Sequence, residues 1–341
     1  MPDVNPAAPP LNPGIVFGMI QAKQQSAALK AAIDLDVFRA VGQGPGDVAS
    51  IAGHCKASER GIRILCDFLV IHGVLQKENG HYKHTPSSAA FLDPASPACL
   101  ASVAQFMSSS SLADPTEQLT EIVRNGRTSL EGEGSVEPEN PLWVQFATQM
   151  APMMAPMAAP LGKVVLNDRS GPFHVLDIAA GHGLFGIEIA KQNPDAHVTG
   201  LDWAPVLRVA IDNAKKAGVE SRYTMLAGSA FEVDFGGPYD AVLLTNFLHH
   251  FDKPTCIGLL KKVHAALKPG GRVATLEFVP NPDRVSPPMP AAFAMTMLLT
   301  TASGDAYTLS ELSDMYHEAG FKDAVGHPIP MSPHTIVLGH A

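Results

Sequence analysis

The chain has 341 residues, of which 46% are hydrophobic and 17% are charged, and its formal net charge is −9. This length suits about two globular domains with cores of their own, and the acidic balance argues against a protein that coats nucleic acid. The four cysteines form no Cys-x-x-Cys pair and no zinc spacing, which indicates reduced thiols and a cytoplasmic protein.

The chain begins with a Pro-rich stretch, residues 1–13, which is expected to be a disordered arm. It lacks the basic start and the long apolar run of a secretory signal. The apolar stretches near 150–161 and 289–302 are too short or too interrupted by Pro, Thr and Ser to span a membrane.

Residues 14–100 are predicted to form a mostly helical domain that ends in a hairpin around Glu78-Asn79-Gly80. The predicted helices cover 15–32, 34–41, 46–54 and 58–72. This winged-helix pattern suits either DNA binding or dimerisation. Residues 1–100 contain eight Lys/Arg and eight Asp/Glu, too few net cations to neutralise phosphates, so dimerisation is favoured. The apolar residues of 15–20 indicate a buried or partner-facing helix.

Residues 101–170 are interpreted as a helical linker that carries part of a substrate pocket. An acidic, Gly- and Pro-rich loop at 131–141 precedes a Met-rich run at 146–157. Methionine suits adaptable apolar pockets, although these methionines are equally compatible with an ordinary core. Prolines at 152, 156 and 160 are expected to kink or interrupt a helix here.

The sharpest motif is a glycine turn near the start of the last region, 171–341, where strand and helix patterns alternate as in a parallel sheet. An apolar strand, 174–178, runs into a turn with Gly181 and Gly183 before a helical pattern at 184–192. Glycine permits a tight turn and the close approach of a ligand. Asp202 ends the next strand, where a carboxylate can accept hydrogen bonds from both hydroxyls of a ribose. The pattern therefore predicts a cofactor that contains a ribose.

Two features favour S-adenosylmethionine over a nicotinamide dinucleotide. Asp177, at the end of the strand before the turn, could meet an ammonium group and would repel a pyrophosphate. The chain also lacks a Tyr-x-x-x-Lys pair for hydride transfer. The alternatives are a capping carboxylate at Asp177 and an ordinary strand-to-helix turn at the glycines.

Four blocks in this order resemble the S-adenosylmethionine-dependent small-molecule O-methyltransferases of the plant caffeic acid type and their bacterial relatives. The blocks are VLDIAAGHG (175–183), GLDWAPVL (200–207), NFLHHFD (246–252) and KPGGRVATLEFV (268–279). The resemblance covers about 14–341 and implies an α/β fold: a Rossmann-like sheet with an antiparallel last strand, which the two terminal strand patterns suit. It further implies an N-terminal winged-helix-like domain that forms a homodimer, a place in secondary metabolism, S-adenosylhomocysteine as product, and no metal, nucleic acid or membrane partner.

The resemblance also implies which residues hold the cofactor. Asp177, Gly181 and Gly183 would hold its methionine end, Asp202 its ribose, and Trp203 would lie beside its adenine. The remaining cofactor positions are Gly228, Ser229, Ala230, Phe231, Thr245 and Asn246. Ser229 stands where the family usually has Asp, so adenine recognition is expected either to be looser or to use the Ser229 hydroxyl. Thr245 stands where plant members have Lys, which is another departure in the cofactor pocket.

Methyl transfer to a hydroxyl needs a base that works at neutral pH, and histidine is the natural choice. His249 follows an apolar strand that ends near 245, which places it at the ligand-binding edge of the sheet, and it matches the family's base. Glu277 ends the next strand and would orient it. The family's second acidic position falls on Ala306, so neighbouring Asp305 is the expected substitute. His250 replaces the family's Asp, and adjacent histidines rarely bind one metal ion.

By the same resemblance, Phe146, Met150, His250, Met297 and Thr301 would line an acceptor pocket. They suggest a flat, apolar acceptor, aromatic or polyketide-like, with one reactive hydroxyl. Three other functions remain open from the sequence: C- or N-methylation or a non-methylating relative of the same fold, a DNA-binding regulator, and an NAD-dependent oxidoreductase.

Overall fold

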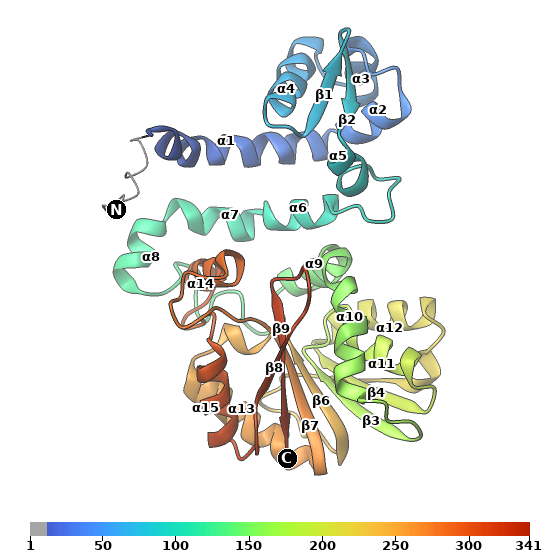
Figure 1. Ribbon diagram of the computed structural model, residues 1–341, viewed down its shortest axis with the longest axis vertical. Coiled ribbons are helices and arrows are strands. Elements are labelled where there is room, and N and C mark those ends of the chain that lie inside the picture. Colours follow the sequence, from blue (N-terminus) through green and yellow to red (C-terminus); the bar gives the residue numbers. More distant parts are fainter. Residues whose placement is uncertain (1–11) are drawn as a thin grey trace, which may run out of the picture. The chain divides into compact units, whose positions relative to one another are not determined.

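The computed structural model describes residues 12–341, so residues 1–11 of the expected arm lie outside the described part. The chain divides into two compact units, Met1–Ser108 and Ser109–Ala341 (Figure 1). The helix Ala101–Met107 falls in the first unit, whereas the sequence placed a boundary at 100. Within residues 12–341, no helix combines the length and apolar character needed to cross a membrane.

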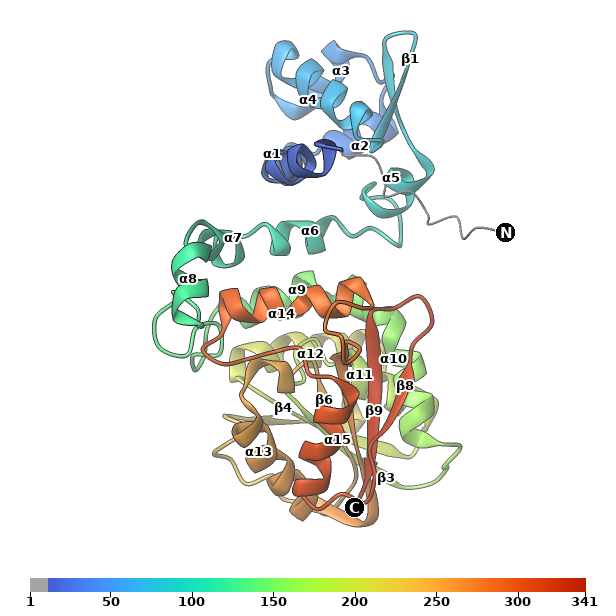
Figure 2. The same cartoon turned by 60° about the vertical axis from the view of Figure 1, so that its left-hand side comes forward.

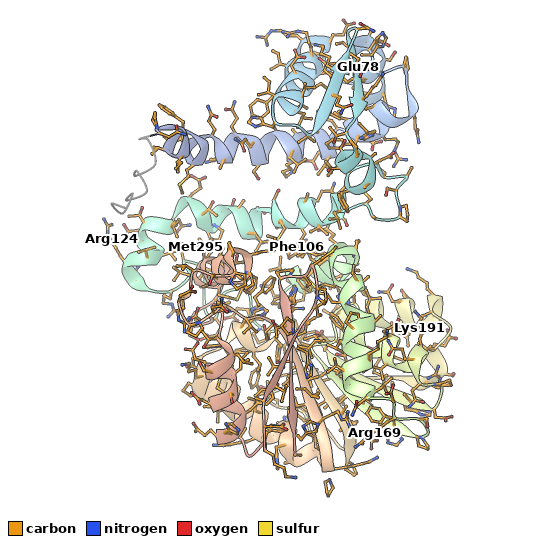
Figure 3. All side chains as sticks on the ribbon, in the orientation of Figure 1. Glu78, Phe106, Arg124, Arg169, Lys191 and Met295 are labelled. Atoms are coloured by element: carbon orange, nitrogen blue, oxygen red, sulfur yellow. The ribbon has the colours of Figure 1, made fainter. Side chains whose placement is uncertain are left out.

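The first unit consists of helices followed by a two-stranded hairpin, as predicted. Its elements are α1 (Gly14–Asp34), α2 (Val37–Gln43), α3 (Val48–Cys55), α4 (Glu59–Ile71), β1 (Leu75–Glu78), β2 (His81–His84), α5 (Pro86–Phe91) and α6 (Ala101–Met107). Asp47 and Ser58 cap α3 and α4, because each side chain accepts a hydrogen bond from a backbone N–H three residues on. Asn79 and Gly80 have the positive φ angles of a two-residue hairpin turn, next to Glu78 (Figure 3).

The core of the first unit lies where α2, α3, α4 and the hairpin meet. Its large buried side chains include Phe38, Ile51, Ile62, Leu75 and Tyr82. By contrast, α1 begins with apolar side chains that are 60–78% exposed: Ile15, Val16, Phe17, Met19 and Ile20. Within the first unit these side chains are not buried, which favours the partner-facing reading of this stretch.

A seven-stranded sheet forms the centre of the second unit. Its strands are β3 (Phe173–Ile178), β4 (Ala196–Asp202), β5 (Tyr223–Ala227), β6 (Tyr239–Thr245), β7 (Leu267–Phe278), β8 (Val325–Pro328) and β9 (His334–His340). Their spatial order is β5-β4-β3-β6-β7-β9-β8. Strands β3 to β7 pair in parallel, and β9 is antiparallel to both of its neighbours. The predicted Rossmann-like sheet with an antiparallel last strand is confirmed. Its strand order reverses between β3 and β6, where such sheets bind ligands.

Helices cover both faces of this sheet. The helices of the second unit are α7 (Ser110–Glu117), α8 (Leu119–Asn125), α9 (Leu142–Gln149), α10 (Ala151–Leu166), α11 (Leu184–Gln192), α12 (Ala204–Lys216), α13 (Lys253–Ala266), α14 (Pro288–Thr300) and α15 (Leu309–Glu318). Helices α10, α11 and α12 pack side by side, and α13 packs with α15 on the other face (Figures 1 and 2). Because both faces are covered, the middle of β6, Val242 to Leu244, is completely buried.

Prolines 152, 156 and 160 are expected to kink or interrupt a helix, and the structure shows no interruption at the last two. Pro156 and Pro160 lie inside α10, which continues to Leu166. The break falls instead at Met150, between α9 and α10, and Pro152 lies in the first turn of α10, where its missing N–H costs nothing. Burial of one face of α10 against the sheet and α11 outweighs the two lost backbone hydrogen bonds.

Candidate active site

The turn after β3 owes its shape to glycine. Gly181 and Gly183 have φ angles of 56° and 73°. A Cβ on Gly183 would lie 2.9 Å from the Cβ of Ala210, and one on Gly186 would lie 2.6 Å from Val198 Cγ1, so larger residues would push α11 and α12 from the sheet. A Cβ on Gly181 would meet only the backbone of its own turn. The turn therefore leaves a bare backbone surface that a ligand can approach.

Two carboxylates border this turn. Asp177 is completely buried; its Oδ2 accepts a hydrogen bond from the Gly186 N–H (3.2 Å), whereas its Oδ1 has no partner among the described residues. Burial raises the pKa of Asp177 to about 8. Asp202 accepts hydrogen bonds from the N–H groups of Gly181 (2.9 Å) and Trp203 (2.7 Å), and burial raises its pKa to about 6. An unpaired buried carboxylate oxygen suits a cationic ligand end rather than a pyrophosphate, so the residues fit the expected S-adenosylmethionine.

The turn after β5 lies beside Asp202, because the Gly228 N–H donates to the Asp202 backbone carbonyl (3.0 Å). Ser229 Oγ accepts from the Phe231 N–H (3.2 Å), and Lys262 Nζ donates to the Ala230 carbonyl (3.0 Å). Phe231 is 42% exposed, and its ring lies 5.0 Å from the ring of Phe251. The structure thus brings the expected adenine-side residues to the carboxyl edge of β4 and β5.

His249 and Glu277 form a buried pair at the neighbouring strand ends. His249 lies in a short 3-10 turn, Leu248–His250, just beyond β6, and Glu277 is the penultimate residue of β7. His249 Nδ1 lies 2.5 Å from Glu277 Oε2, and Oε1 of the same carboxylate accepts the N–H groups of Phe247 (3.1 Å) and Leu248 (2.9 Å). One carboxylate therefore fixes both the turn and the imidazole. With Nδ1–H donating to Glu277, Nε2 is left as the proton-accepting nitrogen.

Aromatic rings surround His249. The Phe293 ring of α14 lies 4.8 Å away and stacks on Phe278 at 3.9 Å. The His250 ring lies 4.3 Å from His249 and 5.2 Å from Trp143 of α9. Burial and the neighbouring His249 hold the pKa of His250 well below its usual value, so His250 is neutral, and its buried Nδ1 has no partner within residues 12–341. Sequence reasoning named His250 but gave no role to Trp143 or Phe293.

Asp305, the expected second acid, does not face the His249 ring. Its carboxylate accepts hydrogen bonds from Arg284 Nη1 (3.2 Å) and from the Ala306 N–H (2.8 Å), and its side chain is 41% exposed. Only its backbone reaches the pair, where its N–H donates to the His249 carbonyl (3.0 Å). Asp305 therefore supports the backbone of the His249 turn, and Glu277 is the carboxylate that engages the imidazole.

The residues expected to line the acceptor pocket differ in their burial and in whether their polar atoms are free to bind a ligand. Met150 and Met297 are buried, and the Phe146 ring lies 5.8 Å from Trp143. Thr301 has no free hydroxyl, because Oγ1 donates to the Met297 carbonyl (2.7 Å) and accepts from the Gly304 N–H (2.9 Å). Thr301 therefore ends α14, and Phe293 is the residue of this helix that lies beside His249.

Asn246 connects the site to the last strand. Its Oδ1 lies 3.0 Å from Nε2 of His334, the first residue of β9, and its Nδ2 contacts Met154 Sδ at 3.7 Å. Burial, and to a smaller extent the neighbouring His249, lowers the pKa of His334 to about 3, so His334 is a neutral hydrogen-bond partner. Buried Thr245 precedes Asn246 at the end of β6. Nothing in the sequence pointed to His334, which lies 88 residues from Asn246.

Across residues 12–341, no group of three or more His, Cys, Asp or Glu side chains lies close enough to hold a metal ion. The two histidines of the 3-10 turn are thus not part of a ligand cluster in the described chain.

A cluster of charged side chains around Glu311 holds the segment that contains Asp305, next to the His249 turn. Arg284 Nη2 donates to both carboxylate oxygens of Glu311 (2.6 and 2.7 Å), and Lys253 Nζ donates to the same group (2.8 Å). Glu311 also completes the capping box of α15 with Thr308. Burial alone would raise the pKa of Glu311, but the hydrogen bonds from Lys253 and Thr308 and the charge of Arg284 lower it to about 2.

Replacing Glu311 with alanine is expected to lower the free energy of unfolding by about 2 kcal/mol at pH 7, from the lost cap and the partly exposed ion pairs. Since the folded-state pKa is depressed, this contribution is present above the ordinary Glu pKa of 4.5 and is lost as pH falls towards 2. Urea unfolding at pH 7 and pH 3 measures it. The control is Glu318→Ala, whose 63% exposed carboxylate is 3.9 Å from Lys261. Equal losses in both variants would contradict the role given to Glu311.

Comparison with known proteins finds a matching family model for each of the two units. Residues 154–322 match the model of an O-methyltransferase domain, and residues 18–94 match that of an O-methyltransferase dimerisation domain. A crystal structure of a protein assigned as an O-methyltransferase from Nostoc punctiforme is 46% identical, with a TM-score of 0.94 over 97% of this chain and 100% of that one. The 3-hydroxy-5-methyl-1-naphthoate 3-O-methyltransferase of Streptomyces sahachiroi is 27% identical over 90% of this chain and 89% of its own length. Human N-acetylserotonin methyltransferase, solved with S-adenosylmethionine, shares the fold at 22% identity, with a TM-score of 0.83 over 98% of this chain and 99% of that one.

Proposed function

The chain belongs to the O-methyltransferase family, as an S-adenosylmethionine-dependent methyltransferase of the secondary-metabolism type, and from this premise we propose that it methylates a hydroxyl of an apolar aromatic or polyketide-like small molecule with His249 as general base. The observation that carries the proposal is the buried His249–Glu277 pair, 2.5 Å apart, at the carboxyl edge of β6 and β7. The naphthoate-methylating relative supports an aromatic hydroxyl as the acceptor.

The residues of this chain would divide the work as follows. When bound, S-adenosylmethionine would supply an electrophilic methyl group attached to its cationic sulfur. The sulfur would keep the electron pair of the carbon–sulfur bond when the methyl group leaves. His249 Nε2 accepts the proton of the acceptor hydroxyl as its oxygen attacks the methyl carbon. The Glu277 carboxylate holds the ring in one tautomer and stabilises the imidazolium that forms. Phe293 and Trp143 exclude water and give an aromatic acceptor surfaces to stack on.

The first unit is proposed to form a homodimer. Its match to a dimerisation domain, residues 18–94, supports this, as do the exposed apolar residues at the start of α1. Contiguous exposed apolar side chains are typical of protein–protein interfaces. The proposed assembly therefore buries the exposed apolar start of α1.

Asp202 is proposed to hold the ribose of the cofactor, and Asp202→Ala tests this role. The variant loses charge-assisted hydrogen bonds, so the Kd for S-adenosylhomocysteine is expected to rise by about fiftyfold. Calorimetric titration measures it, with Asp212→Ala as the control, because Asp212 lies on the exposed side of α12 and pairs with Lys215 at 3.5 Å. An unchanged Kd in Asp202→Ala would remove Asp202 from the cofactor site.

The acceptor class is tested by incubating the protein with S-adenosylmethionine and a panel of phenols, hydroxynaphthoates and polyketide-like aromatics. Each member is paired with an analogue in which the reactive hydroxyl is already methylated. We expect a product heavier by one CH₂ unit from the free hydroxyls and none from the methylated analogues. Equal turnover of both members of a pair would indicate methylation of carbon or nitrogen instead.

A further inference from the structure

A tyrosine from β5 reaches under the glycine turn. Strands β3, β4 and β5 are in register so that Asp177 faces Gly200 and Val198 faces Tyr223. Because Gly200 has no side chain, the Tyr223 ring lies across β4: a Cβ on Gly200 would be 2.4 Å from the phenol oxygen. The same oxygen would be 3.0 Å from a Cβ on Gly183, within the turn. Two glycines therefore make room for one hydroxyl between β4 and the turn.

This hydroxyl and the carboxylate beside it are both unpaired. The Tyr223 hydroxyl and Asp177 Oδ1 are buried and lack hydrogen-bond partners among the described residues. The charges of Asp177 and Asp202 add to burial in raising the pKa of Tyr223, which places the three groups within electrostatic reach of one another. A buried hydroxyl without a partner costs stability, and phenylalanine would fill the same space without that cost. The fold itself therefore does not explain why this residue is tyrosine and not phenylalanine, and a role for the hydroxyl in ligand binding would.

We propose that Tyr223 is a positioning residue for the amino-acid end of the cofactor, acting through Asp177. The Tyr223 hydroxyl donates to Asp177, directly or through a water molecule, and so holds the carboxylate charged and oriented when the ligand ammonium lies above the turn. Asp177 is completely buried, so its effect on the ligand depends on such a network beneath the backbone. This inference rests on the proposed cofactor and names a residue on which its affinity depends.

The test is Tyr223→Phe in the full-length protein, titrated calorimetrically with S-adenosylhomocysteine and with methylthioadenosine, which has the same adenosine but no amino-acid end. We expect the Kd for S-adenosylhomocysteine to rise about tenfold, the effect of one hydrogen bond to a charged group, and the Kd for methylthioadenosine to change less than about twofold. The Tm of the ligand-free variant should not fall, since the hydroxyl has no partner there.

The matched control is Tyr316→Phe. Tyr316 is also buried, but its hydroxyl donates to Thr275 Oγ1 (3.3 Å) and to the Val337 carbonyl (3.2 Å). This variant should lose stability and keep the wild-type ratio of the two Kd values. If Tyr223→Phe weakens both ligands equally, or neither, the positioning role is wrong. A wild-type protein that binds neither ligand would overturn the proposed cofactor and this inference together.

Discussion

Replacing His249 with alanine is expected to reduce kcat for methyl transfer about a thousandfold, the usual effect of losing a general base. The imidazole lies 2.5 Å from Glu277 and beside the Phe293 ring, with Nε2 free to accept a proton. The two carboxylates of the cofactor site, Asp177 and Asp202, lie on β3 and β4, so the Kd for S-adenosylhomocysteine should stay within about twofold of the wild-type value. A variant that loses turnover but still binds S-adenosylhomocysteine would show that His249 serves proton transfer and not cofactor binding.

Two further variants make this result interpretable. His249→Asn keeps a polar side chain of similar reach and should be as inactive as His249→Ala, which excludes a mere packing defect. His317→Ala, on the exposed end of α15, should keep wild-type turnover. Near-normal kcat in His249→Ala would remove this residue from the mechanism.

Replacing Glu277 with glutamine is expected to lower kcat by about two to three orders of magnitude, because the imidazole loses the carboxylate that sets its tautomer. Glu277 accepts from the His249 ring and from the Phe247 and Leu248 N–H groups at once. The amide keeps the two backbone N–H groups only through neutral hydrogen bonds to its oxygen, and its NH2 group then faces His249 Nδ1 and favours the other tautomer. We therefore expect the free energy of unfolding to fall as well, by about 2 kcal/mol.

The activity and stability effects can be separated with Glu277→Asp. Aspartate keeps the charge but shortens the reach, so activity should fall less than in Glu277→Gln while stability falls at least as far. Stopped assays with the best acceptor and urea unfolding measure the two. A Glu277→Gln variant with wild-type kcat would show that the carboxylate serves the backbone turn alone.

Local spacing was enough to predict where the glycine turn and its two carboxylates lie in the fold. The glycine turn, Asp177 and Asp202 lie within one strand–helix–strand unit, whose geometry follows from the chain order. His249 and Glu277 could be paired from 28 residues apart because both end neighbouring parallel strands, so the topology alone brings them together.

The residues that sequence reasoning missed or misplaced come from segments whose position is set by packing over long range. Trp143 and Phe293 reach the site from helices outside the strand–helix repeat, and His334 comes from the antiparallel last strand. Asp305 is close to His249 through its backbone, but its carboxylate accepts a hydrogen bond from Arg284, 21 residues earlier, instead of from the imidazole. No local pattern encodes that ion pair.

The most direct test of the account follows a labelled methyl group. S-adenosylmethionine with a carbon-13 methyl is incubated with the best acceptor and either wild-type protein or His249→Ala, and the labelled product is assigned by NMR. The account predicts a labelled methoxy group with wild-type protein and almost none with a variant that still binds S-adenosylhomocysteine. Label on carbon or nitrogen, or equal methoxy yield from both proteins, would contradict hydroxyl methylation with His249 as base.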